Sequence, residues 1–205
     1  AKLSIASDLL DDDTRTGKDT FNLLFKTMNE CLTIWNELKD TSRIIHTYIK
    51  KGEYYAEYKY FDSALQSMQI AQSYFSKFDY KAIDYYNFLF GKIYYQKGKA
   101  NNNSVSDFNE AIKYFNECLP YAKKTKNRKL EAWCYDWLSV CYKNLGDYKL
   151  SYEYLEKHSY LYGSIVAEDN FKELSKIEHK YEVERKEKEI ISLNAANQQK
   201  STLNK

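Results

Sequence analysis

The chain has 205 residues, and 31 Lys and Arg against 29 Asp and Glu leave a formal net charge of +2. So balanced a charge gives no electrostatic footprint for a nucleic-acid-binding protein. No apolar run is long enough to cross a bilayer, which argues against a membrane-spanning segment within these residues. One proline and six glycines leave little to interrupt helices, so most of the chain can be helical.

The N-terminal residues 1–20 predict a short helix and a loop ahead of any regular pattern. Ala1–Leu10 can form the helix, and the acidic run that follows is typical of a loop. This segment is interpreted as a degenerate or truncated repeat. Because the chain begins at Ala1 with neither a Met nor a signal peptide, we expect a processed product or an excised fragment.

A four-step ladder of mostly apolar residues recurs four times, about 40 residues apart. Steps of four, three and four place each set on one face of a helix. Such a period is typical of stacked helical repeats, which bind other molecules far more often than they catalyse. The four sets are Leu24, Met28, Cys31 and Trp35; Ala64, Met68, Ala71 and Phe75; Ala111, Phe115, Cys118 and Ala122; and Ser151, Leu155, His158 and Tyr162.

The ladders fall on the second helices of successive helix pairs. Phe21–Leu38 is expected to be the second helix of an earlier pair. A repeat domain is therefore predicted over residues 21–163. Its three complete pairs are Thr41–Glu57 with Tyr60–Phe78, Lys81–Lys97 with Asp107–Lys124, and Lys129–Leu145 with Tyr148–Tyr162.

Local sequence also indicates where these helices begin, end and touch. Gly146 is expected just beyond a helix end, with Asp147 capping the next helix. Asp40 and Asn127 can cap two other helix starts. Small residues are expected where the two helices of a pair approach closely, at Gly91, Ser139, Ala64, Ala111 and Ser151.

These residues resemble the tetratricopeptide repeat (TPR) family over roughly Phe21–Tyr162, most closely in the Leu-x3-Tyr-x2-Leu-Gly-Asp-Tyr run from Leu138 to Tyr148. The resemblance implies an all-α, TPR-like right-handed solenoid of antiparallel helix pairs. The period near 40 exceeds the family's usual length of roughly 34 residues. An insertion, Lys99–Ser106, is expected to form a polar surface loop, and Pro120 to kink or end its helix.

After Tyr162 the chain becomes dense in Glu and Lys, which predicts a long charged helix over residues 164–195 and a frayed tail over 196–205. Its early part can cover the end of the last repeat. A sparse apolar stripe leaves two states open, a monomer and a homodimer through Ile177, Tyr181 and Ile191. Glu184 and Lys188 interrupt the heptad of this stripe.

The segment Lys180–Leu193 resembles the charged helix that follows the repeats in bacterial membrane-tethered TPR regulators. That resemblance implies periplasmic repeats, then one membrane span and a cytoplasmic helix-turn-helix or histidine-kinase output. Any contact with a membrane would use segments that are absent from this chain. The alternative is an ordinary solvated helix that caps the repeats.

No residue pattern predicts an enzyme, a metal site or a cofactor. The three histidines, His46, His158 and His179, are scattered, and the chain has no GxSxG, HExxH, P-loop or GxGxxG motif. Cys134 and Cys141 are on one helix and on the order of 10 Å apart, too far for a disulfide. All four cysteines are expected to be reduced and buried.

In TPR folds the first helices of the pairs line a concave groove, and exposed aromatic residues there suit an extended peptide or a partner helix. Alternatively, Phe88 and Trp133 are core residues and the C-terminal helix folds into the groove. The carboxylate clamp of chaperone-binding TPR domains is absent, because Ile49, Leu89 and Trp137 stand at three of its positions. The groove positions carried over to this chain are His46, Ile49, Glu53, Tyr85, Phe88, Lys92, Tyr95, Trp133, Asp136, Val140 and Lys143.

The sequence therefore predicts a non-enzymatic TPR domain that binds a protein or peptide and no nucleic acid. We expect it to be the sensing or interaction part of a bacterial signal-transduction or transcription-regulating protein, periplasmic and tethered to the inner membrane. One alternative is a cytoplasmic peptide-responsive regulator, a compartment that free cysteines favour. Another is a structural scaffold whose groove is filled by its own tail.

Overall fold

In the computed structural model, which describes residues 17–75 and 83–203, every regular element of these residues is an α-helix. Side chains are described for residues 21–75 and 85–191. The predicted Ala1–Leu10 helix and the predicted helix ends at Phe78 and Lys81 lie outside the described residues. The seven helices described are α2 (Gly17–Glu37), α3 (Thr41–Glu57), α4 (Phe61–Phe75), α5 (Ile83–Ala100), α6 (Val105–Lys124), α7 (Arg128–Asn144) and α8 (Tyr148–Leu203).

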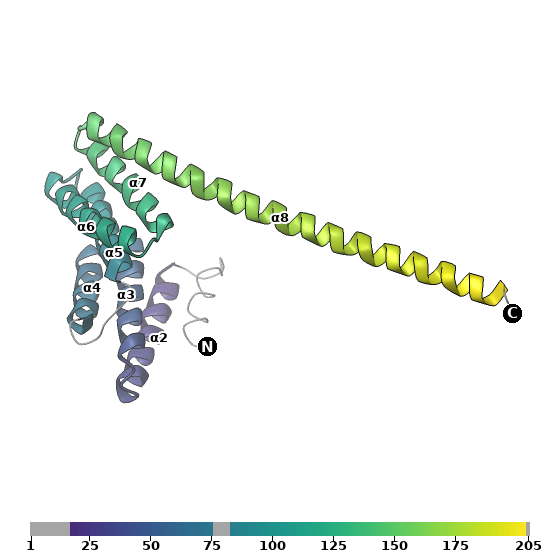
Figure 1. Ribbon diagram of the computed structural model, residues 1–205. Coiled ribbons are helices and arrows are strands. Elements are labelled where there is room, and N and C mark those ends of the chain that lie inside the picture. Colours follow the sequence, from purple (N-terminus) through teal and green to yellow (C-terminus); the bar gives the residue numbers. More distant parts are fainter. Residues whose placement is uncertain (1–16, 76–82, 204–205) are drawn as a thin grey trace. The chain divides into compact units, whose positions relative to one another are not determined.

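Consecutive helices pack as antiparallel pairs (Figure 1). Helix α3 packs on α4, α5 on α6, and α7 on the first turns of α8, as the sequence predicts. The bounds of α3 match the predicted Thr41–Glu57, whereas α2 begins four residues before the predicted Phe21. In addition, α3 contacts α5 and α5 contacts α7, so the first helices of successive pairs are neighbours.

Three of the four predicted ladders form the core. In these three sets every residue except Trp35 and Phe75 is exposed by 1% or less. The fourth ladder is wrong at Leu155 and Tyr162, which are 45% and 46% exposed. Helices α4 and α6 each contact two neighbouring helices. The first turns of α8 contact α7 through Ser151, Tyr154 and His158.

Small residues let the paired helices approach closely, as predicted. A Cβ atom at Gly91 would lie 2.6 Å from Cε1 of Phe115, well inside van der Waals contact. Where α7 meets α8, the hydroxyls of Ser139 and Ser151 are 3.3 Å apart and share a hydrogen bond. At Gly91 this contact leaves no room for a larger side chain.

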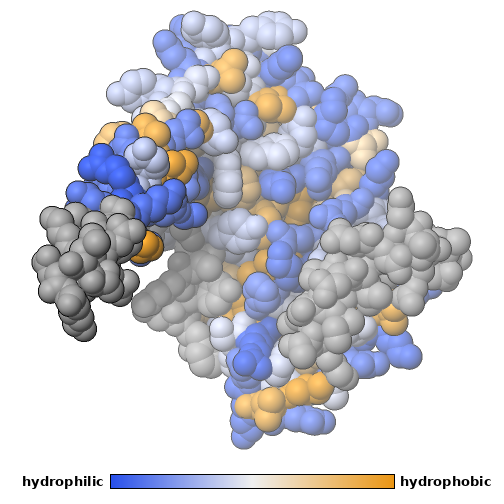
Figure 2. Space-filling model, turned by 90° about the vertical axis from the view of Figure 1, so that its right-hand side faces the viewer, coloured by the Kyte–Doolittle hydropathy of each residue, from blue (hydrophilic) through white to orange (hydrophobic). Residues whose placement is uncertain are grey.

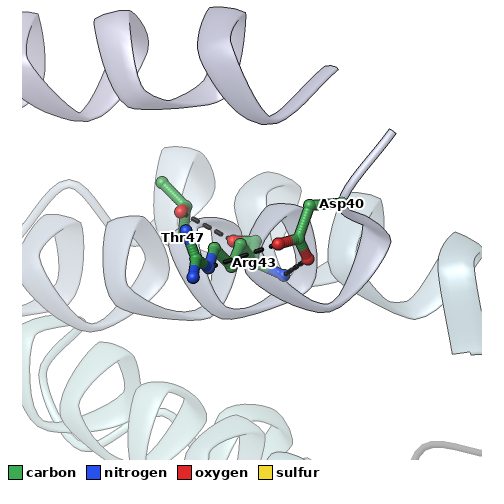
Figure 3. Close-up of polar contacts among 3 residues, drawn as sticks. All are labelled: Asp40, Arg43 and Thr47. Carbon is green, nitrogen blue, oxygen red and sulfur yellow. Dashed lines mark hydrogen bonds and ion pairs between the residues drawn. The ribbon is translucent and has the colours of Figure 1, made fainter. Parts of the chain in front are cut away.

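The predicted caps are confirmed. Asp40 accepts a hydrogen bond from the Arg43 backbone N–H at 3.1 Å, and its other carboxylate oxygen lies 3.2 Å from Arg43 Nε (Figure 3). One turn further on, the Thr47 hydroxyl donates to the Arg43 carbonyl at 2.8 Å. Asn127 and Asp147 accept from backbone N–H groups three residues later, at 3.2 and 3.0 Å. Each side chain satisfies an N–H that the first helical turn leaves unpaired.

Four inter-helix turns share one geometry. Each has a residue with positive φ, namely Lys39 (52°), Lys59 (65°), Lys126 (55°) and Gly146 (81°). In each turn the next N–H donates to a carbonyl five residues earlier, at 2.8 to 3.0 Å. This is the Schellman arrangement, in which glycine is the preferred residue at the positive-φ position.

One local prediction on the second pair needs correction. The loop predicted over Lys99–Ser106 is reduced to residues 101–104, because Ser104 caps α6 by accepting from the Asp107 N–H at 3.3 Å. Helix α6 also runs through Pro120 and ends at Lys124. There the Thr125 N–H and hydroxyl both bond the Tyr121 carbonyl and close the last turn.

Helix α8 is continuous from Tyr148 to Leu203 and crosses the predicted boundaries after residues 163 and 195 without a break. Its first residues, up to His158, belong to a compact unit with the preceding helices, and a second unit begins at Ser159. Exposed ion pairs follow its surface, such as Lys176 with Glu173 at 2.6 Å. Within the described residues, no helix combines the length and the apolar character that a membrane span requires.

Candidate functional site

The predicted groove residues lie on α3, α5 and α7, the three helices that contact one another in succession. Across the first junction, the Tyr85 hydroxyl of α5 donates to Glu53 Oε1 of α3 at 3.3 Å. Across the second, the rings of Phe88 on α5 and Trp133 on α7 have centroids 5.9 Å apart. The fold thus brings residues from all three helices into one surface, which we call the α3–α5–α7 face.

A charged and polar cluster forms the α3 side of this face. Lys50 Nζ lies 2.6 Å from Glu53 Oε2, and Tyr85 bonds the other oxygen of the same carboxylate. Burial alone would lower the pKa of Lys50, but the hydrogen bond and charge of Glu53 outweigh it and raise this pKa. Burial, together with the Glu53 charge, raises the pKa of Tyr85. At neutral pH, Lys50 is therefore charged and the Tyr85 hydroxyl keeps its proton, and both groups contact Glu53.

His46 lies one turn before Lys50 on α3, and its side chain is exposed. Desolvation and the Lys50 charge lower the pKa of His46 from its ordinary value of 6.5, while Glu53 opposes them. The imidazole is consequently neutral at pH 7 and can both donate and accept a hydrogen bond.

Aromatic side chains dominate the junction between α5 and α7. Tyr85 stacks beside Phe88 at a centroid distance of 6.2 Å, and Tyr95 meets the edge of Trp137 at 5.0 Å. Lys92 Nζ lies 5.9 Å from the centroid of the Trp137 ring. Tyr85 and Trp133 are 39% and 43% exposed, so both offer ring surface to a ligand. Trp137 was not among the predicted groove residues, although it lies one helical turn beyond Trp133.

Ile49 and Phe88 differ from the other predicted groove residues. They are only 4% and 5% exposed, and each belongs to a hydrophobic core cluster. Phe88 also contacts Phe115 of α6 at 5.8 Å. Both side chains therefore pack in the core beneath the α3–α5–α7 face. For Phe88, this agrees with the alternative prediction that it is a core residue.

The α7 end of the face carries the remaining predicted residues. Asp136 and Val140 are half-buried, and Lys143 is exposed. Among the described contacts, none joins Asp136 or Lys143 to another predicted groove residue. Asp136 and Lys143 therefore lie on α7 outside the group of predicted groove residues that contact one another.

Two hollows lie between α3 and α5 and share Ala56, Glu57 and Gln96. The larger, of about 420 Å³, is also lined by Phe61 and Tyr95. The smaller, of about 60 Å³, has Leu89 and Ile93 in its lining, with Glu53, Glu57 and Lys92 as its charged members. Of these lining residues, Glu53, Lys92 and Tyr95 are predicted groove residues. Sequence reasoning missed Glu57 and Gln96, although they stand one helical turn beyond Glu53 and Lys92.

Hydrophobic residues gather in separate small patches on the face shown in Figure 2, where orange atoms are dispersed among blue and white ones. Tyrosine and tryptophan have intermediate hydropathy, so an aromatic surface appears pale in such a view.

The thiols offer little reactivity. All four cysteines are buried and outside any disulfide bond, as predicted. Burial raises the pKa of the Cys141 thiol to about 12, which keeps it protonated and unreactive at neutral pH. Among the described side chains, no group of three or more His, Cys, Asp or Glu is placed to hold a metal ion.

Comparison with protein-family models and with curated proteins gives no match for this chain.

Proposed function

We propose that this chain binds an extended protein or peptide segment on the α3–α5–α7 face. The observation that carries the proposal is the contact between predicted residues of three helices, Glu53 with Tyr85 and Phe88 with Trp133. Exposed Tyr and Trp rings beside charged groups are typical of surfaces that recognise proteins. The finer fold that we propose with this function is a TPR-like right-handed solenoid, which the succession of contacts from α3 to α5 to α7 supports.

The composition of the face favours an extended peptide as the ligand. The hollows between α3 and α5 have apolar Leu89, Ile93 and Phe61 in their lining and can accept an apolar side chain. Charges of both signs surround them, with Glu57 on α3 and Lys92 and Lys99 on α5. A peptide with one apolar anchor and flanking polar residues satisfies both features.

The wider role that we propose is the sensing or interaction part of a bacterial signalling or transcription-regulating protein. The continuity of α8 with the last helix pair supports this role, because a continuous helix can transmit a change at its base. A periplasmic, membrane-tethered location and a cytoplasmic one remain the two alternatives. A scaffold without sensing is the rival function, and it predicts binding without any change in α8.

The test uses a phage-displayed library of short random peptides, selected on the full chain. A variant with Tyr85→Ala and Trp133→Ala removes the two exposed rings while keeping the buried Phe88. Tyr121→Ala on α6 is the matched control, because Tyr121 is 44% exposed and lies outside the face. We expect the selected peptides to bind the double variant about tenfold or more weakly, and the control as tightly as the parent chain.

Circular dichroism on each variant separates a lost binding surface from lost folding. Equal binding of the selected peptides to the parent chain and the double variant would contradict the α3–α5–α7 face. A failure of the selection to enrich any peptide would contradict an extended peptide as the ligand.

A further inference from the structure

The second half of α8 carries an apolar stripe that nothing in the described residues covers. Leu174, Ile177, Tyr181 and Ile191 are between 54% and 67% exposed. These positions lie in the unit that begins at Ser159. Exposure of several large apolar side chains along one helix costs free energy unless another surface covers them.

The stripe follows a heptad pattern. Leu174, Ile177, Tyr181, Glu184, Lys188 and Ile191 are spaced by three, four, three, four and three residues. That spacing is typical of the seam of a two-stranded coiled coil, with alternate members at the a and d positions. Two of the six seam residues are charged, and they have opposite signs. The charges therefore carry information about the orientation of a partner helix.

A parallel pair of α8 helices is opposed by these charges. Parallel strands place each seam residue beside its own copy, so Glu184 would face Glu184 and Lys188 would face Lys188. The flanking positions add a further conflict, since Lys180 of one helix would lie near Arg185 of the other. Like charges that face each other in a seam are destabilising.

An antiparallel pair removes the conflict in the seam. In one register, centred at Lys186, an a position faces a d position at every layer. Glu184 then faces Lys188 of the second copy, and Tyr181 faces Ile191 of the second copy. Each chain contributes both members, so two Glu–Lys pairs form at the centre. Within one chain, Glu184 has a weak, exposed ion pair with Lys180 at 3.9 Å, which can be exchanged.

We propose that two copies of this chain associate through an antiparallel coiled coil of α8, centred at Lys186, in which Glu184 pairs with Lys188 of the other copy. Arg185 approaches its own copy in this register, and added salt screens both that repulsion and the attraction between Glu184 and Lys188. The proposal concerns α8 alone and does not depend on the ligand of the α3–α5–α7 face.

Charge reversal tests the register on the full chain by sedimentation equilibrium. In the antiparallel register, Glu184→Lys and Lys188→Glu each create two like-charge pairs, and we expect each to raise the dimer dissociation constant at least about tenfold. The double variant restores two opposite-charge pairs and the parental dissociation constant. Glu182→Lys and Lys186→Glu make the same charge changes outside the seam. Each should leave the dimer dissociation constant within about threefold of the parental value.

Cysteine cross-linking tests the orientation independently. A chain with Tyr181→Cys and Ile191→Cys should form an interchain disulfide under mild oxidation, and one with Tyr181→Cys alone should not. A chain that stays monomeric at all concentrations would overturn the proposal. So would a dimer that both single charge reversals leave intact, or one that Tyr181→Cys alone cross-links.

Discussion

The backbone of Gly91 lies against the ring of Phe115, so close that a Cβ atom at position 91 would stand 2.6 Å from Cε1 of that ring. Phe115 is fully buried and also contacts Phe88 and Trp137. The ring therefore has no free space into which it can move. This contact fixes the separation of α5 and α6 and, through Phe88, supports the surface that carries Tyr85 and Trp133.

Gly91→Ala is expected to lower the free energy of unfolding by about 1–3 kcal/mol, because the added methyl group forces Phe115 or the helix to shift. The measurement is urea unfolding followed by circular dichroism. Gly163→Ala is the matched control, since nothing lies within 4 Å of a Cβ there. In that helical position Ala is favoured over Gly by up to about 1 kcal/mol, so the control should not destabilise the chain. Unchanged stability of the Gly91 variant would contradict the tight contact.

A buried hydrogen bond joins α5 to α4. The Tyr86 hydroxyl donates to the Met68 carbonyl at 2.9 Å, and Tyr86 is 1% exposed. Tyr86→Phe keeps the ring contacts with Phe75 and Phe90 and removes only this bond. We expect the free energy of unfolding to fall by about 1 kcal/mol. Tyr114→Phe is the control, because Tyr114 makes ring contacts with Phe90 and Tyr94 and no hydrogen bond of its hydroxyl is found. Equal effects of the two changes would contradict the role of the bond.

The helix ends were predictable because capping is a local property. Asp40, Asn127 and Asp147 act on N–H groups three residues away, and Gly146 adopts the positive φ that its position suggests. Ser104 has the same local role, but the polar run around it resembled a longer loop. The three buried ladders were predictable for a similar reason, since helical spacing alone defines the face.

Exposure at the site was harder to predict, because it depends on neighbouring helices. Phe88 and Trp133 are both large and aromatic, yet one is 5% and the other 43% exposed. The difference arises because Phe88 also reaches Phe115 on α6. Leu155 follows the apolar ladder, yet it is 45% exposed. Sequence spacing shows which face a residue is on and leaves open what packs against that face.

Three of the four Schellman turns have lysine where glycine is preferred, which predicts a stabilising substitution. Lys126 is exposed and has φ of 55°, a conformation that costs a residue with a Cβ about 1 kcal/mol. Lys126→Gly is expected to raise the free energy of unfolding by about 0.5–1 kcal/mol, after the greater freedom of glycine in the unfolded chain is subtracted. The reverse change, Gly146→Ala, should lower it by a similar amount, since only φ and no contact opposes the new Cβ. Both are measured by thermal unfolding, and a loss of stability in the Lys126 variant would contradict the strain.

His46 predicts a weak dependence of stability on pH. Its pKa is lowered in the folded chain by burial and by Lys50, with Glu53 opposing, so the unfolded chain binds more protons near pH 6. The contribution of His46 is therefore present above the ordinary pKa of 6.5 and is lost as the pH falls through the lower folded value. His46→Gln should make the urea midpoint less sensitive to acidification from about pH 7.5 to about pH 5.5. His179→Gln, on the exposed part of α8, should leave the sensitivity unchanged. A parent chain and His46 variant that lose stability in parallel would show that other groups set the acid response.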